Sequence, residues 1–307
     1  MISVIIISKN EGAMLQQTVD FMLKAKSDTP YEIIVVDDGS EDASCDFISE
    51  SRYASQVIPI QISGSGIASA RNTGAEYASG DILVFCDAHI IVEDHWLDKM
   101  AKAMEQESAQ AVCPVICNME KSFLPKSYAD VMFIASSAEQ NWSGCGKTFL
   151  SLTKTGYLEV PNSPIEVPIV TGPCTMFDRK TFNDVGGFGT EFIGYGWEEE
   201  EISLKLWTFG YRIIGIPDTC VQHWFRTLPP YLIKKHDLFY NLLIMGFCHY
   251  GEERLNQLKE NLIDYPQADG YLNQISNNFA CKTIKEQIYT RRIYDDSWYM
   301  NRFKLPF

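Results

Sequence analysis

Three short, continuously apolar runs rich in β-branched residues alternate with amphipathic segments in the first third of the chain. The runs are residues 2–8 (ISVIIIS), 32–37 (EIIVVD) and 81–86 (DILVFC), separated by helical apolar spacing over roughly 11–26 and 66–79. Runs that are apolar at nearly every position are typical of strands buried on both faces. The alternation therefore predicts an α/β fold, with helices covering both faces of a mostly parallel sheet.

Polar residues follow each of the three runs. In open α/β sheets, ligands bind at the carboxyl ends of the strands. The segments 9–11 (Lys-Asn-Glu), 37–40 (Asp-Asp-Gly-Ser) and 87–89 (Asp-Ala-His) are therefore the first candidates for a site. Asp37 and Asp38 are open to two interpretations. One is a simple turn with an aspartate capping the next helix, and the other is a carboxylate that accepts hydrogen bonds from a uracil N–H or a ribose hydroxyl.

Asp87 and His89 are two residues apart at the end of a predicted strand, so their side chains are expected to point to the same side. One carboxylate oxygen and one imidazole nitrogen suit a first-row divalent ion such as Mn²⁺ better than Ca²⁺. An isolated D-x-H triplet also arises by chance. Its place directly after a buried strand favours a metal site.

The segment 64–80 indicates a helix that lies close to the sheet. Ala70, Gly74 and Ala78 are four residues apart and share one face, which permits a close approach of backbones. Arg71 lies next to that face and is expected to point toward the strand ends, where its guanidinium can hold a carboxylate or a phosphate with two parallel hydrogen bonds. The alternative is an ordinary solvated arginine.

An acidic run, 198–201, follows Trp197 and opens another predicted helix. Acidic residues in a first helical turn are stabilised by the helix dipole. Four in a row exceed what capping needs, and their mutual repulsion costs stability unless at least one has a function. His223 follows an apolar run, 211–216, that Pro217 is expected to end, and its interpretation as a structural residue or a ligand stays open.

The net charge of the chain limits the kinds of molecule that it can bind. The 307 residues carry a net charge of −14, which argues against a nucleic-acid backbone because phosphates would be repelled. An acidic chain of this kind suits a protein that recruits a divalent cation to hold an anionic ligand. Its length leaves one or two domains open.

No targeting segment is expected. The first ten residues lack the basic region of a signal peptide, and the longest apolar stretch, 238–245, is too short to span a bilayer, although peripheral membrane contact stays open. The nine cysteines form an odd set without metal-ligand spacing. They predict reduced thiols and a cytoplasmic location.

Two other regions differ from the strand–helix pattern. The irregular, proline-containing stretch 112–170, with its loop 142–146 (Trp-Ser-Gly-Cys-Gly), indicates a variable connection or an acceptor-side insert. Residues 227–307 are predicted to be mostly helical. Their aromatic and basic residues, such as Trp298 and Arg291, favour either a surface that shapes the acceptor side or a helical buttress.

Taken in order, six segments resemble the GT-A glycosyltransferases, in particular the family 2 type and the polypeptide N-acetylgalactosaminyltransferases. They are SVIIISKNEG, EIIVVDDGS, ARNTGAEYASGDILVFCDAH, TGPCTMFDRKTFNDVGGFG, WEEEEISLKLW and VQHWFR, and they run from Ser3 to about Arg226. The resemblance implies a Rossmann-like GT-A fold with a mixed, mostly parallel sheet flanked by helices. Residues 1–226 would form the nucleotide-sugar-binding catalytic domain, and 227–307 a mostly helical extension packed on it.

The resemblance also implies an activity. It is the metal-dependent transfer of a sugar from a UDP-sugar to a carbohydrate, peptide or small-molecule acceptor, with Mn²⁺ or Mg²⁺ as the cofactor. Asp37 or Asp38 would hold the uridine, and Arg71 would lie near the diphosphate. The implied donor-binding residues further include Asp87, Gly172 and Trp197, and the implied metal ligands are Asp87, His89 and His223.

The chain departs from the family pattern at its acidic run. The polypeptide-modifying group has Trp-Gly-Gly-Glu-Asn there, whereas this chain has Gly-Trp-Glu-Glu-Glu-Glu. Inverting relatives place their base second in a Glu-Asp pair. Glu199 falls at that position, with Glu198 before it, while the D-x-H triplet resembles retaining enzymes. Two alternatives to a glycosyltransferase are an inactive nucleotide-sugar-binding protein and a nucleotidyltransferase, although no glycine-rich loop with a lysine follows the first strand.

Overall fold

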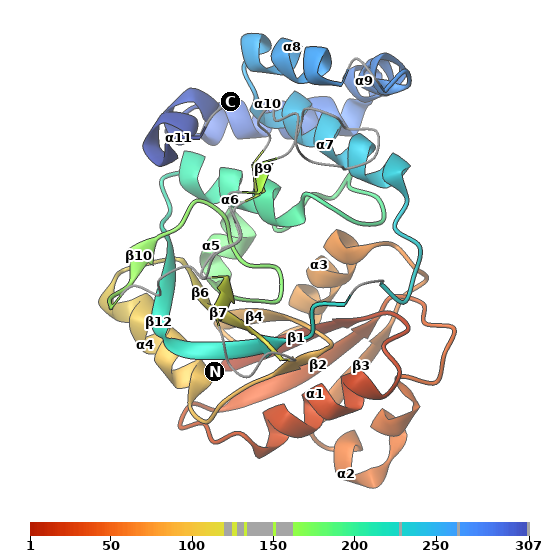
Figure 1. Cartoon of the computed structure of the whole chain (residues 1–307), viewed down its shortest axis with the longest axis vertical. Coiled ribbons are helices and arrows are strands. Elements are labelled where there is room, and N and C mark those ends of the chain that lie inside the picture. Colours follow the sequence, from red (N-terminus) through yellow and green to blue (C-terminus); the bar gives the residue numbers. More distant parts are fainter. Residues whose placement is uncertain are drawn as a thin grey trace.

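The computed structural model describes residues 1–119, 125–127, 132–133, 150–151, 162–226, 229–262 and 265–305. Much of the predicted irregular connection, including the whole of its loop 142–146, lies outside the described residues. The remainder forms a twisted sheet flanked by helices, with a group of helices from the C-terminal part of the chain beyond one face (Figure 1).

The main sheet is mixed, with the strand order β10-β12-β6-β11-β4-β1-β2-β3. Its strands are β1 (Ile2–Ser8), β2 (Tyr31–Asp37), β3 (Val57–Gln61), β4 (Ile82–Asp87), β6 (Ala111–Asn118), β10 (Ile165–Glu166), β11 (Cys174–Asp178) and β12 (Ile213–His223). Two short strands, β5 (Ile90–Ile91) and β7 (Pro125–Ser127), pair with β12 and β6, while β8 (Met132–Phe133) and β9 (Leu150–Ser151) form a separate pair. Strands β1 to β4 run parallel, and β11 lies antiparallel between β4 and β6.

Successive residues of the parallel strands enter opposite cores, as continuous apolar runs require. Val4 and Ile6 of β1 pack with α1 (Ala13–Lys24) and α4 (Trp96–Gln106). Ile5 packs on the other face with α3 (Ile67–Tyr77), α5 (Arg179–Asp184) and α6 (Glu198–Thr208). A short 3₁₀ turn (Asp46–Ser49) and α2 (Ser51–Ala54) join β2 to β3. The predicted α/β sheet with helices on both faces is confirmed.

Strand β12 differs from its prediction. The apolar run was expected to end at Pro217, but β12 continues to His223. The pairing of β12 with β6 shifts register between Gly215 and Cys220, and Pro217 lies within this irregularity. Because the regular pairing is interrupted there, the missing N–H of proline costs no hydrogen bond between the strands. The continuation matters because it delivers His223 to the strand end.

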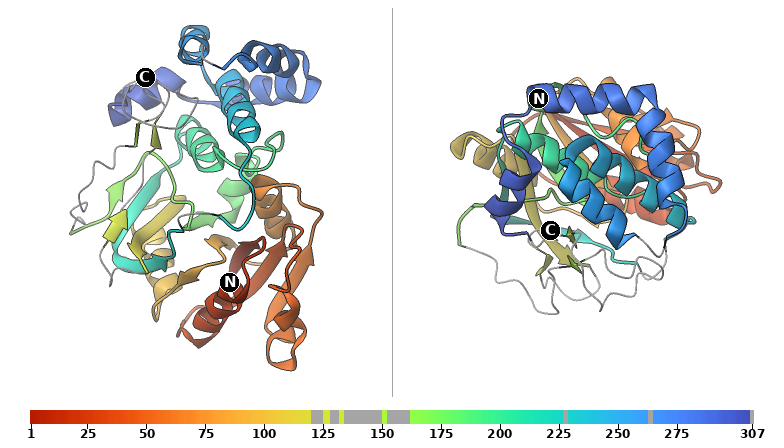
Figure 2. Two further views of the ribbon diagram at one scale, coloured as in Figure 1. Left: turned by 45° about the vertical axis from the view of Figure 1, so that its right-hand side comes forward. Right: turned by 90° about the horizontal axis from the view of Figure 1, so that it is seen from above.

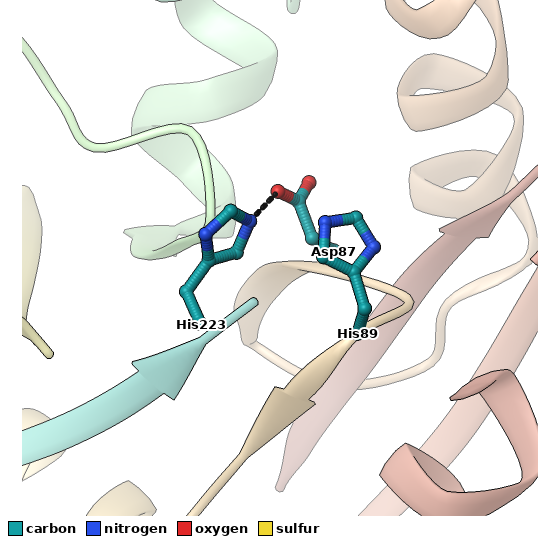
Figure 3. A group of neighbouring side chains, drawn as sticks. All are labelled: Asp87, His89 and His223. Atoms are coloured by element: carbon teal, nitrogen blue, oxygen red, sulfur yellow. Dashed lines mark hydrogen bonds and ion pairs between the residues drawn. The ribbon is translucent and has the colours of Figure 1, made fainter. Parts of the chain in front are cut away.

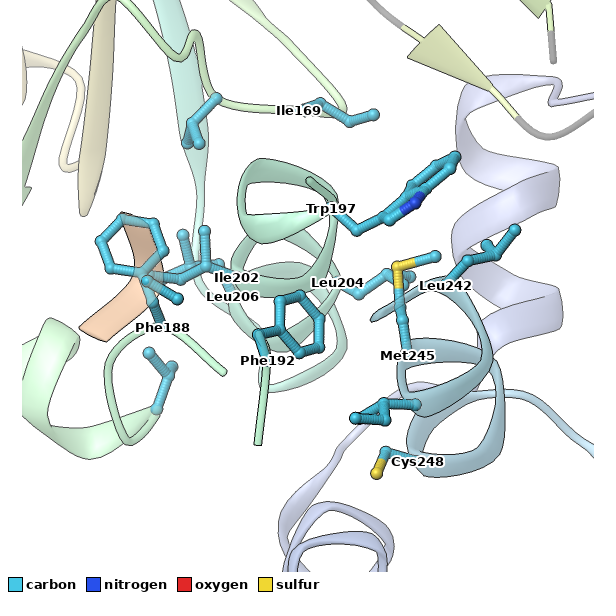
Figure 4. Close-up of a cluster of buried hydrophobic side chains, with 14 of the residues drawn as sticks. Ile169, Phe188, Phe192, Trp197, Ile202, Leu204, Leu206, Leu242, Met245 and Cys248 are labelled. Carbon is cyan, nitrogen blue, oxygen red and sulfur yellow. The ribbon is translucent and has the colours of Figure 1, made fainter. Parts of the chain in front are cut away.

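The C-terminal part is helical, as predicted. It contains α7 (Lys235–His249), α8 (Glu252–Asn261), α9 (Ala268–Asn277), α10 (Phe279–Arg291) and α11 (Asp296–Phe303). These helices lie on the far side of α6 from the sheet (Figures 1 and 2). Side chains of α6 and α7 belong to one hydrophobic cluster, which includes Leu204 of α6 and Leu242 and Met245 of α7 (Figure 4).

One prediction about the cysteines is wrong. Cys117 of β6 and Cys220 of β12 form a disulfide between neighbouring strands, whereas the sequence was interpreted as carrying reduced thiols only. The pairing spans 103 residues, which no spacing pattern reveals. Among the helices that the structure describes, none combines the length and the apolar character needed to cross a bilayer.

Replacing Gly74 with alanine is expected to destabilise the protein by about 1–3 kcal/mol, because it overpacks the contact between α3 and the sheet. A Cβ at this position would lie 2.3 Å from Ile5 Cγ2 and 3.1 Å from Val36 Cγ2. Urea unfolding measures the change. Gly270→Ala in α9 is the matched control, since its Cβ would meet nothing within 4 Å. Equal stabilities of the two variants would contradict the close approach.

Candidate functional site

The carboxyl ends of β1, β2, β4 and β12 converge on one edge of the sheet. The parallel register sets Ser8 beside Asp37 and Ile7 beside Asp87. Strand β12 runs in the same direction, and the short strand β5 pairs with its end, with Ile90 opposite His223. The turn between β4 and β5 thus brings residues of two distant strands together.

Asp87, His89 and His223 lie together at this edge (Figure 3). His223 Nε2 is 3.1 Å from Asp87 Oδ2, and the two imidazole rings are 4.7 Å apart between centroids. One ligand atom from each of the three residues lies within 4.8 Å of the others. The structure therefore brings together the three residues that were predicted as metal ligands from different parts of the sequence.

Neighbouring groups hold the three side chains in place. Thr18 of α1 donates its hydroxyl to the carbonyls of Ala88 and Ile90 and so fixes the turn that carries His89. The Phe225 and His223 rings pack in a T-shaped arrangement, with centroids 4.4 Å apart. Both contacts restrict the side chains before any ligand arrives.

Asp87 is a carboxylate despite its partial burial. Burial alone would raise its pKa, but the hydrogen bond from His223 and the nearby charges of His223, His89 and Arg71 lower the pKa below its usual value. One carboxylate oxygen and two imidazole nitrogens form a ligand set that first-row divalent ions accept. The Asp87 side chain is 24% exposed, so solvent reaches the group. The residues present therefore fit a divalent metal ion.

Arg71, Glu199 and Gly172 form a second cluster. Arg71 Nη1 donates to Glu199 Oε1 at 2.7 Å, and Nη2 donates to the Gly172 carbonyl at 3.3 Å. The arginine side chain is only 4% exposed. Burial alone would lower its pKa, but the negative charges of Glu199, Glu198 and Asp87 raise it, so the guanidinium stays charged. The predicted donor-side arginine is thus a buried cation facing the acidic run.

The four glutamates of the acidic run have different surroundings, which limits their mutual repulsion. Glu198 is 1% exposed, accepts a hydrogen bond from the Gly196 N–H, and has a pKa raised to about 8 by burial and by Glu199. Glu201 pairs with Lys205 and His249 in the core between α6 and α7. Burial and Glu199 also raise the pKa of Glu200. Glu199 alone in the run pairs with Arg71.

Asp37 and Asp38 accept hydrogen bonds from different segments of the backbone. Asp37 Oδ1 accepts a hydrogen bond from the Ser40 N–H at 2.8 Å. Both oxygens of Asp38 accept from the backbone of the loop before α3, with the Ser65 N–H at 2.7 Å and the Gly66 N–H at 3.2 and 3.3 Å. Asp38 therefore ties the end of β2 to the loop that leads into the Arg71 helix.

Comparison with known proteins shows the family. Residues 3–186 match the family model of glycosyl transferase family 2. The chain belongs to glycosyl transferase family 2. Residues 157–225 also match a model described as the N-terminal domain of galactosyltransferase.

Curated relatives of this family 2 chain include polypeptide N-acetylgalactosaminyltransferases. It is 29% identical over 242 residues to type 11 of Xenopus tropicalis, and the match covers 75% of this chain and 39% of the relative. It is 30% identical over 239 residues to type 3 of Drosophila melanogaster, covering 75% and 35%. The match therefore spans little more than a third of the length of these relatives.

Solved structures show the same fold. GalNAc-T7 with UDP, GalNAc and Mn²⁺ matches with a TM-score of 0.72 at 19% identity, covering 99% of this chain and 56% of that one. S. aureus TarS 1-349 with UDP-GlcNAc matches with a TM-score of 0.55 at 15% identity, covering 94% and 79%. At these identities the likeness concerns the fold alone. The predicted GT-A fold is confirmed.

Trp197 precedes the acidic run and contacts α7. Trp197 is 5% exposed, and its indole N–H donates to the Leu238 carbonyl of α7 (Figure 4). It was predicted to bind the donor. That role stays a prediction; in the structure the indole is enclosed in the core and held by its hydrogen bond to α7.

Glu11 was predicted only as part of the candidate segment 9–11, and Arg226 and Tyr231 were not predicted as site residues. Glu11 lies 3.1 Å from His89 Nδ1, and Arg226 pairs with Glu11. Burial, together with the negative charges of Asp87 and Glu11, raises the pKa of the Tyr231 phenol. For Glu11 the sequence held a signal, since it follows the end of β1. For Arg226 and Tyr231 it held none.

Proposed function

We propose that this chain is a metal-dependent glycosyltransferase that transfers a sugar from a UDP-sugar donor to an acceptor hydroxyl. The observation that carries the proposal is the meeting of Asp87, His89 and His223 at the strand ends of a family 2 fold. Relatives named N-acetylgalactosaminyltransferases, and related folds solved with UDP or UDP-GlcNAc, support a UDP-sugar as the donor.

Asp87, His89 and His223 would hold Mn²⁺ or Mg²⁺. When bound, the ion supplies Lewis-acid stabilisation of the charge that builds up on the leaving diphosphate. A positive charge in addition to that of Arg71 is needed to neutralise the diphosphate. The chain has a net charge of −14, and Arg71 supplies one positive charge where a diphosphate carries at least two negative ones.

On the donor side, Arg71 is proposed to contact the diphosphate and Gly172 to leave room beside it. A Cβ on Gly172 would lie 3.0 Å from Glu199 Oε1, so a larger residue would crowd the ion pair. Asp37 is the better candidate for the nucleoside. Both oxygens of Asp38 already hold the loop before α3, whereas within the described residues only Oδ1 of Asp37 is used in this way.

Glu199 is the proposed base if the transfer inverts the anomeric carbon. A diphosphate near Arg71 competes with Glu199 for the guanidinium, and a released Glu199 carboxylate can take the proton of the attacking hydroxyl. Burial and the charge of Glu199 raise the pKa of Glu198 and so favour its protonated form, which makes it second to Glu199 as a base. If the transfer retains configuration, no base is needed there and both residues orient donor and acceptor.

The acceptor is proposed to be a carbohydrate, a peptide or a small molecule, as expected from the sequence. Two basic residues of α10 and α11 do not favour an acceptor surface there, because they form ion pairs within the chain. Arg291 pairs with Asp184 and Arg302 with Glu166, while the Trp298 indole stacks on Tyr294. These contacts favour the buttress interpretation of the two helices.

The cytoplasm is the location proposed from the sequence. The disulfide between Cys117 and Cys220 is the observation against it, because disulfides persist mainly in oxidising compartments. Thiol titration of unfolded protein purified under alkylating conditions decides the point. Nine reactive thiols support the cytoplasm, and seven, together with a disulfide-linked peptide of these two cysteines, oppose it.

A donor screen tests the function. The purified chain is incubated with a panel of UDP-sugars and with GDP-mannose, with Mn²⁺ or with EDTA, and free nucleotide is measured. We expect UDP release from at least one UDP-sugar, dependent on Mn²⁺ and abolished by EDTA. Binding without release would favour an inactive nucleotide-sugar-binding protein. Pyrophosphate release from UTP and a sugar phosphate would favour a nucleotidyltransferase.

A further inference from the structure

Glu11 is a buried carboxylate beside the proposed metal site. It lies between β1 and α1, and its side chain is 5% exposed. An isolated buried carboxylate costs several kcal/mol, so it persists only with partners that compensate for the lost water. Glu11 has two such partners, and they come from the ends of two other strands.

Arg226 is the first partner. It donates through Nη1 to Glu11 Oε1 at 3.2 Å and through Nη2 to Oε2, across 215 residues of sequence. This two-point contact orients the carboxylate as well as neutralising it. The arginine side chain is itself only 12% exposed, and its guanidinium lies 4.7 Å from the centre of the Trp224 ring. The pair is therefore fixed on both sides.

His89 is the second partner, and this contact determines which ring nitrogen carries the proton. Glu11 Oε2 lies 3.1 Å from His89 Nδ1. An ionised carboxylate only accepts hydrogen bonds, so Nδ1 must be the protonated nitrogen. In a neutral imidazole the lone pair then lies on Nε2. In Figure 3 one ring nitrogen of His89 faces the Asp87 carboxylate and the other points away from it.

We propose that Glu11, oriented by Arg226, is a positioning residue that fixes the Nδ1–H tautomer of His89 and presents its Nε2 to the metal ion. The inference rests on the proposed function, since it requires the metal site. Oε2, the oxygen that faces His89, is also the oxygen that Arg226 holds through Nη2, so the arginine keeps it directed at Nδ1. Partners of this kind orient a metal-bound imidazole and increase its basicity.

Mn²⁺ affinity of the donor-free protein is the first test, measured by calorimetry. Glu11→Gln keeps the side-chain shape but removes the charge, and it is expected to weaken Mn²⁺ binding by about 10–100-fold. Glu76→Gln, at an exposed position on α3, is the control and should bind like the wild type. If Glu11→Gln leaves Arg226 unpaired and fails to fold, the double variant with Arg226→Met removes both charges and is expected to show the same loss.

The tautomer of His89 is the second test, and it needs no metal. The chain has five histidines, so protein labelled with ¹⁵N-histidine gives few ring signals, and His89→Ala assigns the one of interest. We expect Nδ1–H in the wild type and a gain of Nε2–H in Glu11→Gln. An Nε2–H tautomer in the wild type would overturn the proposal.

The two proposals fail in different ways. If His223→Ala loses Mn²⁺ while Glu11→Gln binds it within about twofold of the wild type, against the 10–100-fold expected, the metal site stands and the role of Glu11 is wrong. If the wild-type protein binds no Mn²⁺ at all, the metal site and the role of Glu11 are both wrong.

Discussion

Replacing Asp87 or His223 with alanine is expected to lower metal-dependent turnover by more than about 100-fold. Loss of a residue that only supports a metal ligand costs 10–100-fold, so loss of a ligand itself should cost at least as much. The two residues lie 136 positions apart and come from different strands, yet their side chains are 3.1 Å apart. Equal losses at both would be hard to explain unless they share one ion.

Initial rates at saturating UDP-sugar over a range of Mn²⁺ concentrations measure the effect. For both variants we expect a lower maximal rate and a higher Mn²⁺ concentration at half-maximal rate. Glu76→Ala, on the nearby helix α3, removes an acidic side chain outside the group and should change neither value. Circular dichroism and thermal unfolding check that His223→Ala, at a buried position, still folds. Wild-type activity that survives EDTA would refute the metal site.

The parallel strands of the sheet could be predicted from the sequence because each is marked by a short apolar run of consecutive residues. Strand β1 matches its predicted range, and β2 and β4 match to within one residue at each end. Short, continuous runs of β-branched residues rarely form anything other than buried strands. The polar residues at the ends of these strands were accessible for the same reason, since parallel strands end at one edge.

What the sequence could not show depends on long-range pairing. Strand β3 contains Pro59, and β12 continues through Pro217, so both contradict the rule that proline ends a strand. Pro59 is tolerated because β3 is an edge strand, and Pro217 is tolerated because it lies where the pairing of β12 with β6 shifts register. The contact of Glu11 with Arg226 joins residues 215 positions apart, and no periodicity encodes such a contact.

The acidic run shows how burial divides residues that the sequence makes equivalent. Four consecutive glutamates gave no basis for choosing among them beyond a family position. In the structure Glu201 turns toward Lys205 and His249 in the core, whereas Glu199 faces Arg71. Helical geometry separates neighbours by about 100°, so each one meets a different part of the protein.

Glu199→Gln is expected to lower turnover by about 10²–10⁴-fold if Glu199 is the general base of an inverting transfer. Glutamine preserves the shape of the side chain but cannot take the acceptor proton. UDP affinity should remain near the wild-type value, because Arg71 stays in place and is no longer shared with a carboxylate. Glu200→Gln, which makes the same substitution at a neighbouring glutamate that does not pair with Arg71, is the matched control and should retain most activity.

The configuration of the product completes this test. Proton NMR of the early product distinguishes inversion from retention at the anomeric carbon before mutarotation obscures it. Inversion together with a large loss in Glu199→Gln supports the base assignment. Full activity in Glu199→Gln, or a retained configuration with only a small loss, contradicts it. In that case Arg71 and Glu199 would serve to orient the donor, as their 2.7 Å ion pair already permits.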